Sequence, residues 1–261
     1  MKRRLVIISA VLLILSAGQG VLAASLKVGA TPVPHAEILQ RVVPILAEQG
    51  IALEIVEFTD YVRPNLALNE GDLDANFFQH VPYLESFNQD AGTDLVSIGG
   101  IHIEPLGVYS QKVTSLEELP ARASIAIPND ATNGGRALLL LQEAGLITID
   151  PEAGITPTVF DITANKLQIR FVELEAAQLS RSLPDVHAAV INGNYALQAG
   201  LNPIKDAIFL EGAESPYVNV IAVRTADAER EDLKKLVQAL LTPEIREFIL
   251  EEYQGAVVPV F

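Results

Sequence analysis

Apolar residues follow two different periods along the chain, and the change from one to the other predicts an α/β fold. Continuous apolar runs typical of buried strands cover residues 26–30 and 51–58. Between them, apolar residues recur every three to four positions from Ile38 to Leu46, which predicts a helix over residues 34–50. Shorter helices are expected over residues 62–69 and 83–90. This β-α-β-α-β-α order is typical of a parallel sheet covered by helices on both faces.

Residues 95–109 form a long extended run with no helix between its halves. Such a run predicts a strand that leaves one lobe and enters another, and a second α/β series follows from residue 123. Residues 217–224 are another uninterrupted strand, placed to cross back. We therefore expect two α/β lobes joined by two crossing strands, with a ligand cleft between them. The expected first lobe comprises residues 25–106 and 223–261, and the second comprises residues 107–222.

The first 24 residues have the pattern of a secretory signal peptide. Three basic residues, Lys2, Arg3 and Arg4, precede an apolar run over residues 5–15, and small residues lead to Ala23 and Ala24. The run is shorter than the roughly 20 residues that a membrane span needs. We expect export to the periplasm with cleavage after Ala23 or Ala24, and an uncleaved anchor is the alternative.

Charge and cysteine content exclude several classes of protein. The formal net charge is −15, and it becomes −18 without the three basic leader residues. So acidic a chain is a poor partner for nucleic acid or for an anionic membrane surface. The absence of cysteine excludes disulfides, thiolate metal sites and a lipid-anchor cysteine. We expect a monomer that is soluble in the periplasm or tethered by an uncleaved signal segment.

Residues 71–84 (GDLDANFFQHVPYL) are expected to form one wall of a small-molecule cleft. A strand over residues 73–77 runs into Phe78 and His80, and a helix that begins near Pro82 carries Tyr83 in its first turn. In open α/β sheets, ligands bind outside the carboxyl ends of the strands. Tyr61 is a further aromatic candidate. The alternative for each of these rings is an ordinary place in the core.

Arg136 is the candidate for binding a ligand carboxylate. It lies in the segment ATNGGRALLLL, where Thr132 or Asn133 is expected to be the N-cap residue. Arg136 would then occupy the first helical turn, where the helix dipole disfavours a cation. A carboxylate bound by the guanidinium and by the N–H groups of the two glycines would offset that cost. The alternative is a solvated surface arginine.

Two asparagines complete the candidate site. Asn192 follows an apolar strand and precedes a helix, so it is either an N-cap or a ligand-binding amide. Asn219 lies within the apolar strand 217–224, where its amide needs a hydrogen-bond partner in the protein or in a ligand. An amide accepts from an ammonium and donates to a carboxylate, which suits a zwitterion.

The sequence contains no recognisable catalytic or metal-binding motif. The four histidines are scattered, without the HExxH spacing of zinc enzymes, and no GxSxG motif is present. We expect no metal, no cofactor and no catalysis.

Six segments, taken in order, resemble the NlpA/MetQ family of substrate-binding proteins of methionine ABC importers. They are residues 31–37, 58–65, 71–83, 129–136, 190–201 and 214–220. The resemblance covers essentially the whole chain after the leader, and the combination of DANFFQHVPYL with ESPYVN is highly specific.

The resemblance implies a periplasmic-binding-protein fold that closes around methionine and docks on an ABC transporter permease with its ATPase. It further implies that Arg136 holds the carboxylate and that Asn192 and Asn219 bind the amino-acid backbone. The thioether would lie among Tyr61, Phe78, His80 and Tyr83. Family members are commonly lipoproteins, and this chain lacks the cysteine to acylate. Alternatives are another apolar amino acid or a short peptide as ligand, an exported hydrolase or lyase, or a sensing protein without a transporter.

Overall fold

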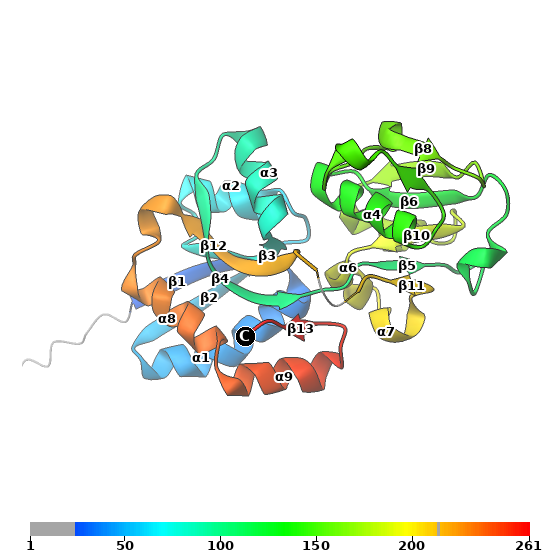
Figure 1. Cartoon of the computed structure of the whole chain (residues 1–261). Helices are drawn as coiled ribbons and strands as arrows, with labels where there is room; N and C mark the ends of the chain where they lie inside the picture. Colours follow the sequence, from blue (N-terminus) through cyan, green and yellow to red (C-terminus); the bar gives the residue numbers. More distant parts are fainter. Residues whose placement is uncertain (1–23, 213–214) are drawn as a thin grey trace, which may run out of the picture.

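Two β-sheets, each flanked by helices, form two lobes in the computed structural model (Figure 1). The structure describes residues 24–212 and 215–261. The leader predicted for residues 1–24 lies outside the described residues, apart from Ala24. The predicted α/β class with two lobes is confirmed.

The first lobe is built on a six-stranded sheet of mixed direction. Its strands lie in the order β13-β4-β12-β3-β1-β2. Strand β1 pairs in parallel with β2 and β3, whereas β12 is antiparallel to both β3 and β4. The expected parallel sheet is thus correct for the first three strands, and β12 enters it in the opposite direction. The bounds are β1 (Ala24–Ala30), β2 (Ile51–Glu57), β3 (Ala75–His80), β4 (Leu95–Ile103), β12 (Val218–Arg224) and β13 (Val258–Pro259).

Amphipathic helices cover this sheet, and their apolar faces form its core. In α1 the residues Ile38, Leu39, Val42 and Leu46 are fully buried, as the helical period predicts. A short helical segment, η1 (Pro32–Ala36), precedes α1 and contacts the second lobe through α6. The helices of this lobe are α1 (Glu37–Glu48), α2 (Arg63–Glu70), α3 (Val81–Ala91), α8 (Glu231–Leu240) and α9 (Pro243–Tyr253).

The second lobe has a five-stranded sheet in the order β11-β5-β10-β6-β9. Its strands are β5 (Gly107–Tyr109), β6 (Ser124–Pro128), β9 (Arg170–Leu174), β10 (Ala188–Ile191) and β11 (Phe209–Leu210). Its helices are α4 (Ala131–Glu143), α5 (Leu179–Ser182), α6 (Gly193–Gln198) and α7 (Pro203–Asp206), and a small hairpin joins β7 (Thr148–Ile149) to β8 (Ile162–Ala164). Helices α4 and α6 follow β6 and β10 directly, so both begin at the carboxyl ends of neighbouring strands.

Two segments cross between the lobes. The first runs from β4 through Glu104 to β5, as the extended run over residues 95–109, with no helix between its halves, predicts. The second lies between β11 and β12 rather than within β12, because all of β12 pairs with strands of the first sheet. The expected lobe boundary after residue 222 therefore falls inside a first-lobe strand and is wrong by a few residues. An apolar strand pattern does not reveal which sheet the strand joins.

Strand β3 is buried on both faces, whereas the sequence predicted a strand over residues 73–77 with one polar face. All six of its residues are buried. The amides of Asn76 and Gln79 form a closed hydrogen-bond network with Asn65 of α2. Because these polar groups satisfy one another, the strand continues to His80, at the edge of the pocket described below.

Candidate functional site

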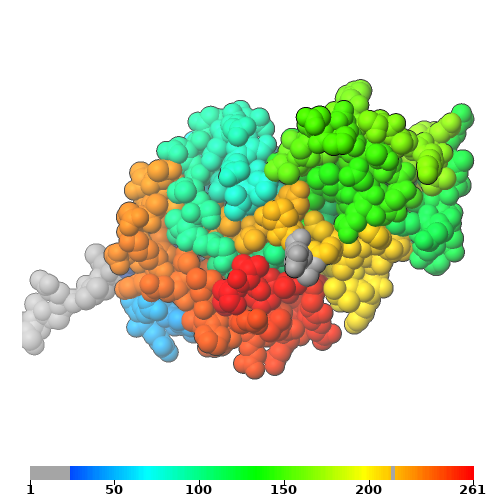
Figure 2. Space-filling model, viewed as in Figure 1, coloured from blue at the N-terminus to red at the C-terminus, as the bar shows by residue number. Residues whose placement is uncertain are grey.

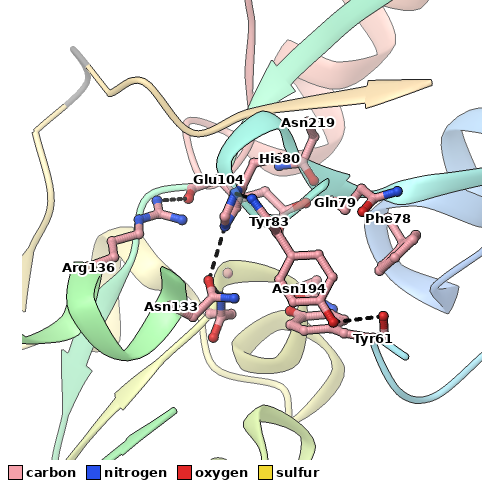
Figure 3. A pocket seen from close by; sticks show the side chains of 12 residues that line it. Tyr61, Phe78, Gln79, His80, Tyr83, Glu104, Asn133, Arg136, Asn194 and Asn219 are labelled. Atoms are coloured by element: carbon pink, nitrogen blue, oxygen red, sulfur yellow. Dashed lines mark hydrogen bonds between the residues drawn. The ribbon is translucent and has the colours of Figure 1, made fainter. Parts of the chain in front are cut away.

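A pocket between the lobes contains about 340 Å³ of empty space, mouth included (Figure 3). It is lined by Tyr61, Phe78, Gln79, His80, Tyr83, Glu104, Asn133, Arg136, Asn192, Gly193, Asn194 and Asn219. All seven residues predicted from the sequence are in this set. The structure thus brings them together from six different elements and loops, and their role in binding a ligand stays a prediction.

Side chains from the two lobes bond to each other across the pocket. The Tyr61 hydroxyl donates to Asn194 Oδ1 at 2.6 Å, and His80 Nε2 lies 3.1 Å from Asn133 Oδ1. Outside the pocket, the Tyr195 hydroxyl donates to the Thr59 carbonyl at 3.1 Å. Helices α3 and α4 also touch, and the space-filling view shows the lobes in contact there (Figure 2). The structure is therefore of the closed arrangement.

Arg136 is buried in the pocket wall, with 4% of its surface exposed. Its Nε donates to Glu211 Oε1 at 2.9 Å, and Nη2 donates to Glu211 Oε2 and to the Glu104 carbonyl. The guanidinium carbon lies 4.2 Å from the Tyr217 ring centroid, at cation–π distance. The solvated surface arginine is excluded. Within the described residues, no hydrogen bond uses Nη1, which leaves that donor for a ligand.

The prediction of Thr132 or Asn133 as the N-cap residue of this helix is wrong. Helix α4 begins at Ala131, and Asp130 is its N-cap residue, whose side chain accepts from the Asn133 N–H at 2.9 Å. Arg136 therefore lies beyond the first turn. The Gly134 N–H donates to the Asp130 carbonyl, so it does not await a ligand. A β-carbon at Gly134 would lie 2.8 Å from the Pro128 carbonyl, which shows that this glycine serves close packing.

Glu104 is a buried carboxyl group in the pocket wall that sequence reasoning missed. His102 Nε2 lies at hydrogen-bond distance, 2.8 Å, from its Oε1, and His35 Nε2 lies 3.3 Å from the same oxygen. Burial raises the pKa of Glu104, while His35, the Asn194 backbone N–H and Arg136 oppose that shift. Glu104 follows the end of β4, in the first crossing between the lobes.

His80 is neutral, and both of its ring nitrogens have protein partners. Its Nδ1 accepts from the Tyr83 N–H at 3.1 Å. Its Nε2 faces Asn133 Oδ1, because the Asn133 Nδ2 donates to Asp130. Nε2 therefore carries the proton. Burial, followed by the charge of Arg136, lowers the pKa of His80 to about 3. At neutral pH this imidazole is fixed in place and does not exchange protons.

Asn192 and Asn194 present unpartnered polar atoms to the pocket. Asn192 occupies the N-cap position of α6, but its side chain makes no capping bond. Its Nδ2 donates instead to Asn133 Oδ1 at 2.7 Å, and its Oδ1 is buried without a partner among the described residues. The Asn194 Nδ2 is also buried without a hydrogen-bond partner among the described residues. A buried amide without a partner is costly, so these atoms point to a polar ligand.

Three aromatic rings form the apolar part of the wall. Tyr61, Phe78 and Tyr83 contact one another, with ring centroids 5.8 to 6.1 Å apart. The Tyr83 hydroxyl donates to the Tyr61 carbonyl at 2.9 Å, which fixes both rings. These rings were predicted because they follow a strand and begin a helix. Beside the polar groups, they offer a flat apolar surface to a side chain.

His35, His102 and Glu104 are the one group in the described part of the chain that brings three metal-binding side chains together. Their ligand atoms lie within 4.8 Å of one another. The hydrogen bond from His102 Nε2 to Glu104 already uses the nitrogen that would face a metal. The His102 Nδ1 also lacks the partner that usually orients a metal-bound imidazole. The geometry therefore favours a hydrogen-bond network here.

The pocket residues missed by sequence reasoning are Gln79, Glu104, Asn133, Gly193 and Asn194. Gln79 and Gly193 adjoin a predicted residue, and Asn133 was considered only as an N-cap. Glu104 had a recoverable signal, because a carboxylate in an apolar extended run needs a partner. Glu211, which pairs with Arg136, had no such signal, because it lies far from Arg136 in the sequence.

The comparison with known proteins identifies the family. A family profile described as NlpA lipoprotein matches residues 26–261. The chain belongs to the NlpA lipoprotein family. Among curated relatives of this NlpA family member, the D-methionine-binding lipoprotein MetQ of Escherichia coli (strain K12) is 47% identical over 225 residues, which are 85% of this chain and 82% of MetQ.

Solved structures in the family have the same fold. A nutrient binding protein from Burkholderia cenocepacia bound to methionine is 48% identical, with a TM-score of 0.87 over 90% of this chain and 100% of its own. Lipoprotein Tp32 from Treponema pallidum is 40% identical, with a TM-score of 0.88 over 91% of this chain and 100% of its own.

The relatives bear on localisation as well. Several of them are named lipoproteins, and these names do not support the expectation of a protein without a lipid anchor. In residues 24–212 and 215–261, no helix has both the length and the apolar character of a membrane span.

Proposed function

We propose that this NlpA family member binds a free zwitterionic amino acid, methionine first, and delivers it to an ABC transporter permease. One observation carries the proposal. The pocket combines an unpartnered buried acceptor, Asn192 Oδ1, with an unpartnered buried donor, Asn194 Nδ2, beside the guanidinium of Arg136. A zwitterion supplies a partner for each of them.

The two charged groups of the ligand have separate requirements. An ammonium has only donors, so it needs the acceptors of the pocket, Glu104 and Asn192 Oδ1. A carboxylate has only acceptors, so it needs Arg136 and the amide donors of Asn194 and Asn219. The Asn219 Oδ1 faces His35 Nε2 at 3.1 Å, which leaves its Nδ2 for the ligand.

The aromatic wall suits an unbranched apolar side chain. A thioether is polarizable, and its contact with an aromatic ring is worth about 0.3–1.5 kcal/mol. Tyr61, Phe78 and Tyr83 supply the rings. The names of the relatives favour methionine, since two of them are a D-methionine-binding lipoprotein and a protein bound to methionine.

The closed arrangement supports capture and release rather than chemistry. The bond between Tyr61 and Asn194 can form only when the lobes meet, so a ligand in the pocket would be enclosed. His80, the one imidazole that lines the pocket, has both nitrogens occupied and a lowered pKa. It is therefore a poor general base. An exported hydrolase or lyase remains the remote alternative, and turnover in a substrate screen would support it.

Another apolar amino acid or a short peptide is the nearer alternative. The bond between Tyr61 and Asn194 closes the pocket between the lobes, and this favours a single amino acid over a longer ligand. We infer that the protein acts outside the cytoplasm, since the predicted leader and the lipoprotein names agree on export.

The ligand that copurifies with the protein tests this proposal directly. The protein is purified without added amino acids and denatured, and the released small molecules are identified by mass spectrometry. We expect methionine at up to one equivalent from the unsubstituted protein and from Arg230→Ala, and none from Arg136→Ala. A stoichiometric ligand without an amino-acid zwitterion would overturn the proposal.

A further inference from the structure

His102 does not line the pocket, and its side chain has a single polar contact within the described residues. Its side chain is fully buried in β4, between β12 and β13. Within the described residues, the imidazole makes one hydrogen bond, from Nε2 to Glu104 Oε1 at 2.8 Å, and its Nδ1 has no partner. A buried imidazole is costly when half of it is unsatisfied. An apolar residue would pack at this position without that cost, so the bond to Glu104 is the property that distinguishes histidine here.

The carboxyl group that His102 holds faces the ligand space. Glu104 lines the pocket, and a β-carbon on Gly193 would lie 3.2 Å from its Oε2. The bond from His102 occupies Oε1. A carboxylate offers about four acceptor positions, so Glu104 keeps lone pairs for a donor in the pocket. The only full cation near Glu104 in the described structure is Arg136, which is paired with Glu211.

We propose that His102 is a positioning residue that fixes Glu104 as the acceptor for the ligand's ammonium group. This inference rests on the proposed function, because it assumes an ammonium in the pocket. The Nε2–H of His102 orients the carboxyl and stabilises its ionised form. The ammonium then supplies the countercharge that the pocket otherwise lacks. His35 assists from η1 of the same lobe, with Nε2 at 3.3 Å from Oε1.

Two matched variants separate positioning from packing. In His102→Gln, the amide Nε2 keeps a donor at the position of the imidazole Nε2. In His102→Asn, the shorter side chain does not reach Glu104. Both replace a buried ring with an amide, and the shorter asparagine leaves the larger cavity, so a role in packing alone predicts a difference between the variants that is the same for every ligand.

Two ligands identify which end of the zwitterion is affected. Methionine is compared with 4-(methylthio)butanoic acid, which lacks the amino group and keeps the rest. We expect His102→Asn to bind methionine about tenfold or more weakly than His102→Gln does, since a hydrogen bond to a charged group is lost. We expect no such difference with the amino-free probe. Equal affinities of the two variants for methionine, or the same difference for both ligands, would overturn the proposal.

Measurements without ligand make the test independent of the proposed function. In crystals, the Glu104 carboxyl should keep its position in His102→Gln and move in His102→Asn. In the unsubstituted protein, 15N NMR should show the Nε2-protonated neutral tautomer of His102, and the Nδ1-protonated tautomer would overturn the proposal. Should the unsubstituted protein bind no methionine, the proposed function fails, while these two measurements still decide the positioning role.

Discussion

The hydroxyl of Tyr61 donates to Asn194 Oδ1 at 2.6 Å, across the boundary between the two lobes. Tyr61 belongs to the loop after β2, and Asn194 belongs to α6 of the other lobe. Because the two residues come from separate sheets, this bond depends on closure of the lobes. It links the aromatic wall of the pocket to the amide of Asn194 in the lining from the other lobe.

Tyr61→Phe removes this bond and keeps the ring. We expect methionine affinity to fall between about twofold and tenfold, mostly through faster dissociation, because a neutral hydrogen bond contributes about 0.5–1.5 kcal/mol. Stopped-flow fluorescence or calorimetry measures the change. Tyr109→Phe is the matched control, since the Tyr109 hydroxyl is buried in the second lobe without a partner in the described structure. An unchanged dissociation rate in Tyr61→Phe would mean that the bond does not stabilise the closed form.

Arg136→Ala is expected to weaken methionine binding by roughly 30-fold or more. The ligand carboxylate would be left buried without its cation, which costs about 2–5 kcal/mol. Arg136→Lys keeps the charge but not the planar fork, so it should recover only part of the affinity. Arg230→Ala is the control, because Arg230 pairs with Asp74 and Asp232 in the first lobe and does not line the pocket. A loss below threefold in Arg136→Ala would show that another group holds the carboxylate.

The thioether is expected to matter less than the charges. Replacing methionine by norleucine exchanges sulfur for a methylene group of similar size. We expect affinity to fall by up to about tenfold, because a sulfur–aromatic contact is worth about 0.3–1.5 kcal/mol. In Phe78→Leu the difference between the two ligands should shrink. If norleucine binds more tightly than methionine, the rings do not select the sulfur.

Acid should destabilise the fold through three buried histidines. Burial lowers the pKa of His35 to about 4, and the pKa values of His80 and His102 to about 3. Between pH 6.5 and 4 the unfolded chain therefore binds more protons than the native protein, so the free energy of unfolding falls as the pH falls.

Each histidine contributes up to about 1.4 kcal/mol per pH unit in this range. Glu104 has the opposite effect on the free energy of unfolding, because its pKa is raised in the folded protein. Its contribution to stability is lost as the pH rises through the pKa of Glu104 in the folded protein. Denaturant unfolding at pH 7.5, 6.5 and 5.5 measures the balance. In His80→Asn, the free energy of unfolding should depend less steeply on pH. A free energy of unfolding that is constant from pH 7.5 to 5.5 would contradict the assignment of three neutral histidines.

The sequence predicted the elements well where one periodic pattern dominated. The strand expected over residues 51–58 forms β2, and the apolar positions of α1 are buried. It failed at the start of α4, where several neighbouring polar residues could cap the helix. Asp130 rather than Thr132 or Asn133 caps α4, and this frees the Asn133 amide to bridge His80 and Asn192.

Seven residues of the pocket lining were predicted, but the residues that support them were not. Asn192 and Asn219 stand out because one is polar at a strand end and the other in an apolar strand, and Arg136 stands out as a cation near the start of a helix. Glu211 does not stand out, since its pairing with Arg136 depends on the second crossing between the lobes. The tautomer of His80 likewise depends on Asn133, 53 residues away. Such contacts are set by tertiary packing.

Calorimetric titration of the ligand-stripped protein with L- and D-methionine tests the central claim most directly. The account predicts saturable binding of one equivalent for at least one enantiomer. It also predicts that Arg136→Ala binds methionine much more weakly, whereas Arg230→Ala keeps the affinity of the unsubstituted protein. Absence of heat with both enantiomers, under conditions where another ligand saturates the pocket, would contradict it.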